Sequence, residues 1–252
     1  MSLISTLTLE NMKALHDEIS EKAKTCNSLE SAAQAYMSSL YDNLSESIVL
    51  ARLFATIHFK DLQEEVKSYV KRIVESAGVK DKLKETTLVL TLLGSRGVNN
   101  IWNNRSNSRD HKGIPLISKE FVETIPMPYQ MLKQLGIGLD WIENVDAGLN
   151  LKTAGRINGI FYVRDAKTEV DSKKRKVIAS QEFVDEWNIK SVFGVAGSYL
   201  GSSTFFTTVV FARETLDREI IDRFILQANK FKTATMGIVH KKIFFKNDLN
   251  ME

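Results

Sequence analysis

The chain has 252 residues, of which 43% are hydrophobic and 26% are charged, so it is long enough to bury a full core. Its 34 basic and 31 acidic residues give a net charge of +3, which is too small and too evenly spread for a nucleic-acid-binding protein. No apolar run approaches the roughly 20 residues of a membrane-spanning helix, and the N-terminus lacks the basic start and apolar core of a signal peptide. These features predict a cytoplasmic protein that binds neither nucleic acid nor membranes.

The chain opens with two predicted helices. Thr8 is the candidate N-cap of the first helix, and Asn27, with Glu30 three residues later, is the candidate N-cap of the second. The apolar stripe of the first helix is formed by Leu9, Met12, His16, Ile19 and Ala23. Residues 1–26 are therefore expected to form a peripheral N-terminal helix.

Two strands and an intervening helix are predicted next. β-Branched and aromatic residues are concentrated in Ser47–Phe59 and Thr86–Leu93, which predicts a strand at each. Asp61–Ala77 has helical periodicity. Gly94 and Gly97 are expected to end the second strand.

A long connection, residues 95–150, follows the second strand. Its first part, residues 95–113, is polar and rich in turn-forming residues, so no regular structure is predicted there. A helix is predicted over Ser118–Leu135. Pro126 and Pro128 are expected to end or kink it near its middle. We interpret residues 95–150 as an insertion within a single domain that spans residues 1–252.

The last third of the chain reads as strand, short helix, strand, turn, strand and long helix. The strands are predicted at Ile160–Val163, Val192–Ala196 and Phe206–Ala212, and the final helix at Asp217–Met236. The absence of a regular strand–helix repeat predicts an α/β (α+β) fold in which helices flank a central antiparallel sheet, with the N- and C-terminal helices packed together. The apolar stripes of these two helices exceed what one sheet face covers, so a homodimer through the terminal helices is expected.

The order of these elements resembles the GAF family of small-molecule sensor domains, which are related to the PAS fold. The resemblance starts at Asn27–Leu44 and is clearest in the last third of the chain. Gly159–Asp165 resembles a family strand that ends in Asp, and Ser191–Gly201 resembles a serine-led strand that leads into a hairpin. Ala196 and Gly197 replace the proline that often follows the latter strand. The resemblance implies a GAF/PAS-like sensor domain in signal transduction, with a small-molecule ligand, a signalling partner protein and no catalytic output of its own.

The candidate ligand-binding residues of the polar loop are Trp102, Arg105, Arg109 and His111. An aromatic face and several cations can hold an anionic or planar ligand by stacking and charge-assisted hydrogen bonds. The alternative is a solvated surface loop that is anchored by one tryptophan.

In sensors of the GAF type the ligand lies between the sheet and the segments that cross it. The resemblance therefore implies that the opposite wall comes from sheet residues such as Phe54, Tyr162, Phe193 and Phe206. The competing interpretation is that these aromatic residues only fill the core.

Metal and cofactor sites have little support in the sequence. Cys26 is the only cysteine, which excludes an intramolecular disulfide and a cysteine-pair metal site, and the four histidines lack metal-ligand spacing. No metal site is therefore predicted. A haem held by one histidine, with His58 or His111 as candidates, stays open, and the sequence identifies no other cofactor.

Two other functions stay open beside the sensor. One is a small cytosolic enzyme that acts on a compact metabolite in the same cavity, and the other is an interaction scaffold with a collapsed pocket. We predict no catalytic residue, because the sequence has no nucleophile elbow, P-loop or dinucleotide fingerprint. A core without a cavity would favour the scaffold, and titratable groups clustered around a cavity would favour the enzyme.

Overall fold

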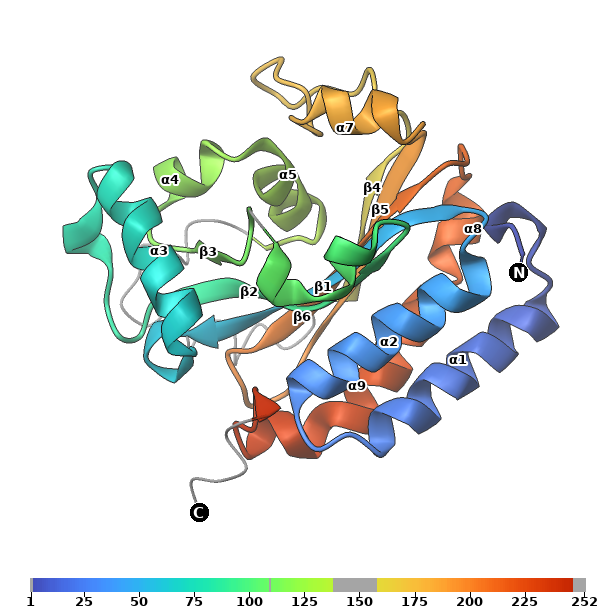
Figure 1. Ribbon diagram of the computed structural model, residues 1–252, viewed down its shortest axis with the longest axis horizontal. Helices are drawn as coiled ribbons and strands as arrows, with labels where there is room; N and C mark the ends of the chain where they lie inside the picture. Colours follow the sequence, from blue (N-terminus) through green and yellow to red (C-terminus); the bar gives the residue numbers. More distant parts are fainter. Residues whose placement is uncertain (1, 109, 138–157, 247–252) are drawn as a thin grey trace.

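A computed structural model describes residues 2–108, 110–137 and 158–246, and its centre is an antiparallel sheet (Figure 1). Within these residues the sheet has 6 strands in the order β3-β2-β1-β6-β5-β4, and each neighbouring pair is antiparallel. The strands are β1 (Ile48–His58), β2 (Leu88–Gly97), β3 (Gly113–Pro115), β4 (Asn158–Val163), β5 (Ser191–Ser198) and β6 (Phe205–Ala212). The predicted α/β fold with a central antiparallel sheet is confirmed.

Three long helices lie on one side of the sheet, at the face that we call the helix face (Figure 1). They are α1 (Leu9–Lys24), α2 (Leu29–Leu44) and α9 (Ile225–His240), the last preceded by the short α8 (Arg218–Asp222). The ring of Phe231 in α9 lies 5.1 Å from that of Tyr36 in α2 and 5.0 Å from that of Phe206 in β6. Since α1 also contacts both α2 and α9, the N- and C-terminal helices pack together as predicted.

Shorter elements lie over the opposite face, which we call the cavity face (Figure 1). They include α4 (Lys119–Glu123), α5 (Pro126–Gln134) and α7 (Gln181–Glu186), together with the 3-10 turns η4 (Asn100–Asn103) and η5 (Arg105–Asn107). The helix α3 (Glu64–Ser76) lies beside the edge strand β3, where Val66 and Val70 approach Gly113. Pro126 is the first residue of α5, where a missing N–H costs nothing. The predicted break in the helix over residues 118–135 is confirmed.

Several predicted boundaries were wrong for identifiable reasons. Ser28, and not Asn27, caps α2, because Ser28 and Ser31 exchange backbone-to-side-chain hydrogen bonds of 3.1 Å. β2 does not end at Gly94 but continues to Gly97. A Cβ at Gly94 would lie 2.5 Å from the carbonyl oxygen of Ala33, so this glycine marks the close approach of α2 to the sheet.

Two other predictions need correction. The predicted final helix is two helices, because the chain turns at Arg223 and places Phe224 in the core, with its ring 5.2 Å from that of Phe193. The polar stretch over residues 95–113 holds the end of β2, two 3-10 turns and the start of β3. The single-domain organisation and the limits of the 95–150 insertion stay predictions.

In the described ranges, no helix is both long enough and apolar enough to cross a membrane.

Candidate functional site

A cavity of about 630 Å³ lies between the cavity face of the sheet and the segments that cross it. Its floor comes from β1 and β6, and its walls come from the β2–β3 connection, from α5 and from residues 177–187. We call it the sheet cavity; among its lining residues are Arg52, Phe54, Trp102, His111, Phe183 and Phe211. Its volume is in the usual range for small-molecule sites.

The pairing of β1 with β6 decides which side chains reach the floor. Arg52 pairs with Val209 and Leu50 pairs with Phe211, so all four side chains project from one face of the sheet. Phe54, two residues after Arg52, joins them. The floor is therefore apolar except for one guanidinium.

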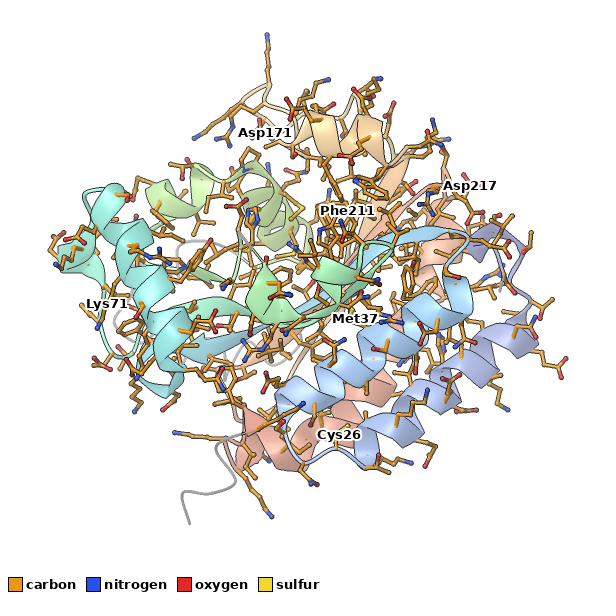
Figure 2. The ribbon with its side chains drawn as sticks, in the orientation of Figure 1. Cys26, Met37, Lys71, Asp171, Phe211 and Asp217 are labelled. Atoms are coloured by element: carbon orange, nitrogen blue, oxygen red, sulfur yellow. The ribbon has the colours of Figure 1, made fainter. Side chains whose placement is uncertain are left out.

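An aromatic cluster forms one wall. The ring of Trp102 in η4 lies edge-on to those of Trp187 (centroids 5.1 Å apart) and Phe183 (5.6 Å), and Phe183 lies edge-on to Phe211 of β6 (5.3 Å). Figure 2 labels Phe211 near the centre of the view, below α7. Because edge-to-face pairs of this kind are favourable by about 0.5 to 1.5 kcal/mol each, the cluster holds the loop over the sheet.

Arg52 is the charged residue on the floor. Its Nε is shielded from solvent and has no hydrogen-bond partner, and its one described hydrogen bond is a long contact of 3.4 Å from a terminal nitrogen to Ser108 Oγ. Burial lowers the pKa of Arg52 to about 10, and the nearby Asp110 opposes this shift. The guanidinium is therefore charged at neutral pH. Our sequence prediction missed Arg52, although a charged residue in the middle of an apolar strand is a readable signal.

His111 lies at the edge of the cavity in a left-handed backbone conformation, with φ of 63°. Its backbone N–H donates to the hydroxyl of Tyr69 at 2.8 Å. Burial, followed by the charge of Arg52, lowers the pKa of the His111 imidazole. The ring is consequently neutral at pH 7 and can donate or accept one hydrogen bond.

The predicted site residues separate into two groups. Trp102, His111 and Phe54 come together around the sheet cavity. Tyr162 and Phe193 pair with each other across β4 and β5 but project from the helix face, where Phe193 packs on Phe224. They do not line the cavity, and neither does Phe206, which packs against Phe231 of α9.

Two further candidates are placed differently from the prediction, and one lies outside the described residues. Arg105 binds other elements of the fold, as detailed below, and Arg109 is not among the described residues. His58, a candidate haem ligand, has both ring nitrogens in hydrogen bonds, to Ser203 Oγ at 2.9 Å and to the carbonyl of Thr86 at 2.8 Å. No group of 3 or more His, Cys, Asp or Glu side chains suited to a metal ion occurs in the part of the chain that the structure describes.

No family model and no curated protein matches this chain. Among solved structures, the GAF domain from a phosphoenolpyruvate-protein phosphotransferase from Coxiella burnetii is 12% identical, with a TM-score of 0.46 over 92% of this chain and 96% of that chain. The phycocyanobilin-bound GAF domain from a cyanobacterial phytochrome is 11% identical, with a TM-score of 0.46 over 93% of this chain and 98% of that chain. Both are likenesses of the fold at low sequence identity. The GAF resemblance seen in the sequence stays a prediction, and the likeness to these structures extends no further than the fold.

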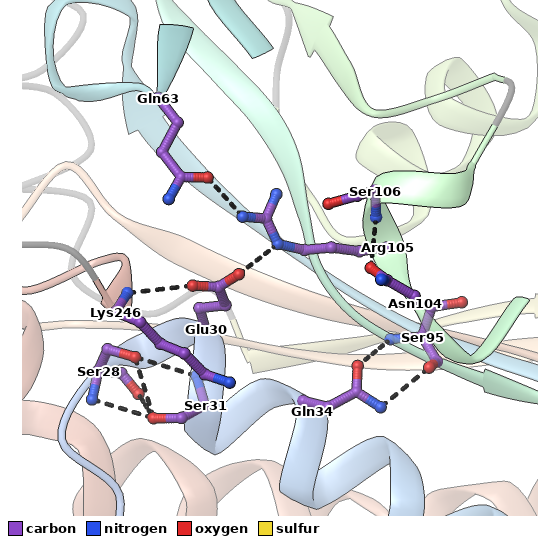
Figure 3. Close-up of polar contacts among 10 residues, drawn as sticks. All are labelled: Ser28, Glu30, Ser31, Gln34, Gln63, Ser95, Asn104, Arg105, Ser106 and Lys246. Carbon is purple, nitrogen blue, oxygen red and sulfur yellow. Dashed lines mark hydrogen bonds and ion pairs between the residues drawn. The ribbon is translucent and has the colours of Figure 1, made fainter. Parts of the chain in front are cut away.

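Arg105 forms a clasp between distant segments (Figure 3). Its Nε donates to Glu30 Oε1 at 2.6 Å and a terminal nitrogen donates to Gln63 Oε1 at 2.6 Å, while its guanidinium lies 5.4 Å from the ring centre of Phe245. Glu30 also accepts a hydrogen bond from the backbone of Lys246. The clasp therefore joins the β2–β3 connection to α2, to the residue that precedes α3 and to the C-terminal segment.

We expect Arg105→Ala to lower the free energy of unfolding by about 2 kcal/mol, because it removes two charge-assisted hydrogen bonds and leaves Glu30 without its cation. The side chains of Arg105 and Glu30 are only 10% and 16% exposed, so solvent replaces these contacts poorly. Urea unfolding followed by circular dichroism measures the loss. Lys80→Ala is the control, since the Lys80–Glu75 ion pair is 69% and 65% exposed and should change stability by under about 0.5 kcal/mol. An equal loss of unfolding free energy in the two variants would contradict a stabilising role of the clasp.

A second depression, of about 520 Å³, lies at the surface around Asp165 and Asp185. Its two carboxylates already have partners. Lys167 forms a 2.7 Å ion pair with Asp185, and Asp165 accepts hydrogen bonds from the backbone of Lys167 and the hydroxyl of Thr168. The sheet cavity is consequently the stronger candidate.

Proposed function

We propose that this chain is a small-molecule-binding sensory domain that holds its ligand in the sheet cavity and has no catalytic output of its own. The observation that carries the proposal is the cavity itself, because about 630 Å³ of space with an aromatic wall and one cation on its floor is the ordinary composition of a ligand site. A scaffold with a collapsed pocket does not account for this space.

The placement of Cys26 supports a binding role over nucleophilic chemistry. It lies where α1 passes into α2, away from the sheet cavity (Figure 2). Burial raises the pKa of its thiol, which lowers the fraction of reactive thiolate at neutral pH.

An enzyme acting in the same cavity is the second candidate, favoured by the presence of Asp110, His111 and Glu186 among the lining residues. The two candidates differ in the fate of the bound compound. Recovery of the compound unchanged after prolonged incubation supports binding alone, and its conversion supports the enzyme.

The proposal predicts that narrowing the cavity removes binding. Ala179 lines the cavity but is exposed, so Ala179→Phe should obstruct the site without disturbing the core. Native mass spectrometry of freshly purified protein should show a retained small molecule in the wild type and about tenfold less of it in the variant. Ala77→Phe, at an exposed alanine that follows α3, is the matched control and should keep full occupancy.

An unliganded wild type would be tested further with 8-anilinonaphthalene-1-sulfonate, whose fluorescence increases in apolar sites. Binding of this dye that is equal in the wild type and Ala179→Phe would contradict the proposal.

Transmission of the signal to a partner protein, homodimer formation through the terminal helices and a cytoplasmic location stay predictions. The stripe residues Met12, Ile19 and Ala23 are buried within one chain. Leu9 and Leu226, which are 71% and 51% exposed, are the apolar residues of α1 and α9 that a dimer would cover.

A further inference from the structure

We infer that the ligand of the sheet cavity is a monocarboxylate with a flat, aromatic body, and that Arg52 binds its carboxylate. This inference rests on the proposed function, because it names the ligand class of the same cavity.

Arg52 has hydrogen-bond donors that no described residue uses. A guanidinium has five N–H donors in a planar fork that matches the two oxygens of a carboxylate. Within the described residues only Ser108 accepts from it, at 3.4 Å, and no Asp or Glu oxygen lies within 4.0 Å as an ion-pair partner. Arg52 is partly buried, and a cation that is withdrawn from water is costly unless it is paired, so the floor of the cavity is set up to receive an anion.

The charge of the lining argues for a single negative charge on the ligand. Arg52 is the one lysine or arginine among the described lining residues, whereas Asp110 and Glu186 are both acidic, and His111 is neutral at pH 7. A monocarboxylate neutralises Arg52. A phosphate monoester carries nearly two negative charges near neutral pH and would meet the two carboxylates without a second cation.

The remaining lining fits a flat apolar body. Trp102, Phe183 and Trp187 form the aromatic wall, and Met127 and Met131 of α5 line the cavity as well. Methionine adapts its shape and makes favourable contacts with aromatic rings. A ring system can therefore lie between the aromatic wall and α5 while its carboxylate contacts Arg52.

The experiment uses probes that share a naphthalene ring and differ in their polar head group. 2-Naphthoate, its neutral amide 2-naphthamide and 2-naphthyl phosphate are titrated into the full chain, and tryptophan fluorescence is recorded because Trp102 and Trp187 line the site. In the wild type we expect 2-naphthoate to bind about 10- to 100-fold more tightly than 2-naphthamide, the range for a hydrogen bond to a charged group. In Arg52→Met the two affinities should become equal.

Two further variants complete the design. Arg52→Gln, which keeps a polar side chain, should also lose the preference, and it replaces Arg52→Met if that variant does not fold. Arg96→Met removes an arginine from β2 that pairs with Asp42 outside the cavity lining, and it should keep the full preference. Without ligand, Arg52→Met should unfold about 2 °C or more above the wild type, because it removes an unpaired cation from an apolar floor.

The possible negative results separate a failure of this inference from a failure of the proposed function. Equal binding of 2-naphthoate and 2-naphthamide to the wild type overturns the role of Arg52 and leaves the cavity as a ligand site. Tighter binding of 2-naphthyl phosphate than of 2-naphthoate overturns the carboxylate assignment. Absence of binding by all three probes overturns this inference, and absence of any retained molecule or dye binding in the wild type overturns the proposed function as well.

Discussion

Gly194→Ala is expected to lower the free energy of unfolding by about 3 kcal/mol or more, which is enough to unfold a protein of ordinary stability partly or completely. A Cβ at Gly194 would lie 1.8 Å from the carbonyl oxygen of Thr208 and 2.9 Å from its carbonyl carbon. Both atoms are backbone atoms of β6, between β1 and β5 in the sheet, so neither can move without disturbing the strand pairing. The Thr208 hydroxyl also accepts a hydrogen bond from the N–H of Val195 at 3.0 Å, which fixes β6 against β5 at this point.

Gly237→Ala is the matched control for this substitution. Gly237 is in the body of α9 and a Cβ there would have nothing within 4 Å. The control should raise stability by up to about 1 kcal/mol, because alanine loses less backbone freedom in a helix than glycine does. Urea unfolding of the two variants beside the wild type measures both effects. A loss below about 0.5 kcal/mol in Gly194→Ala would show that the two strands can separate locally.

The fold was predictable because its strands differ in composition from its helices. β6 is buried along its whole length, so its sequence is a continuous β-branched and aromatic run. Pro126 likewise fixed the break between α4 and α5. Element ends were less predictable, since the end of β2 depends on how α2 approaches Gly94, and no local pattern in the sequence encodes that contact.

The site was predictable only in part, because a strand residue reaches one face or the other according to register. Phe54 and Phe193 both lie in apolar strands, yet the pairing of the strands places them on opposite faces. The pairing of β1 with β2 also shifts its register between Leu53 and Phe54, where Leu93 of β2 has no partner, and composition does not reveal this shift. Arg105 looked like a ligand cation because its partners, Glu30 and Gln63, lie 75 and 42 residues away in the sequence.

His16 was predicted only as part of the apolar stripe of the first helix, but its burial has a consequence for stability. The residue is 1% exposed, because α1 packs at this point against the segment that leads into α9. Neither ring nitrogen has a hydrogen-bond partner in the described structure. The ring of Phe224 lies 6.3 Å from it. Burial is the main cause that lowers the pKa of His16 to about 4; the charge of Lys230 also lowers it, and Asp17, the ion-pair partner of Lys230, opposes the shift.

The folded protein should therefore lose stability as the pH falls from about 6.5 to about 4. In that interval the unfolded chain, in which His16 has its ordinary pKa of 6.5, takes up a proton that the folded chain does not. The loss should reach roughly 3 kcal/mol below pH 4 and be absent above pH 7. His16→Leu removes the titrating group and both unpaired nitrogens, so its stability advantage over the wild type should grow across the interval, while His240→Gln, at an exposed histidine, should follow the wild type. Urea unfolding at successive pH values tests this; parallel curves for His16→Leu and the wild type would show that His16 finds a proton-accepting partner in the folded state.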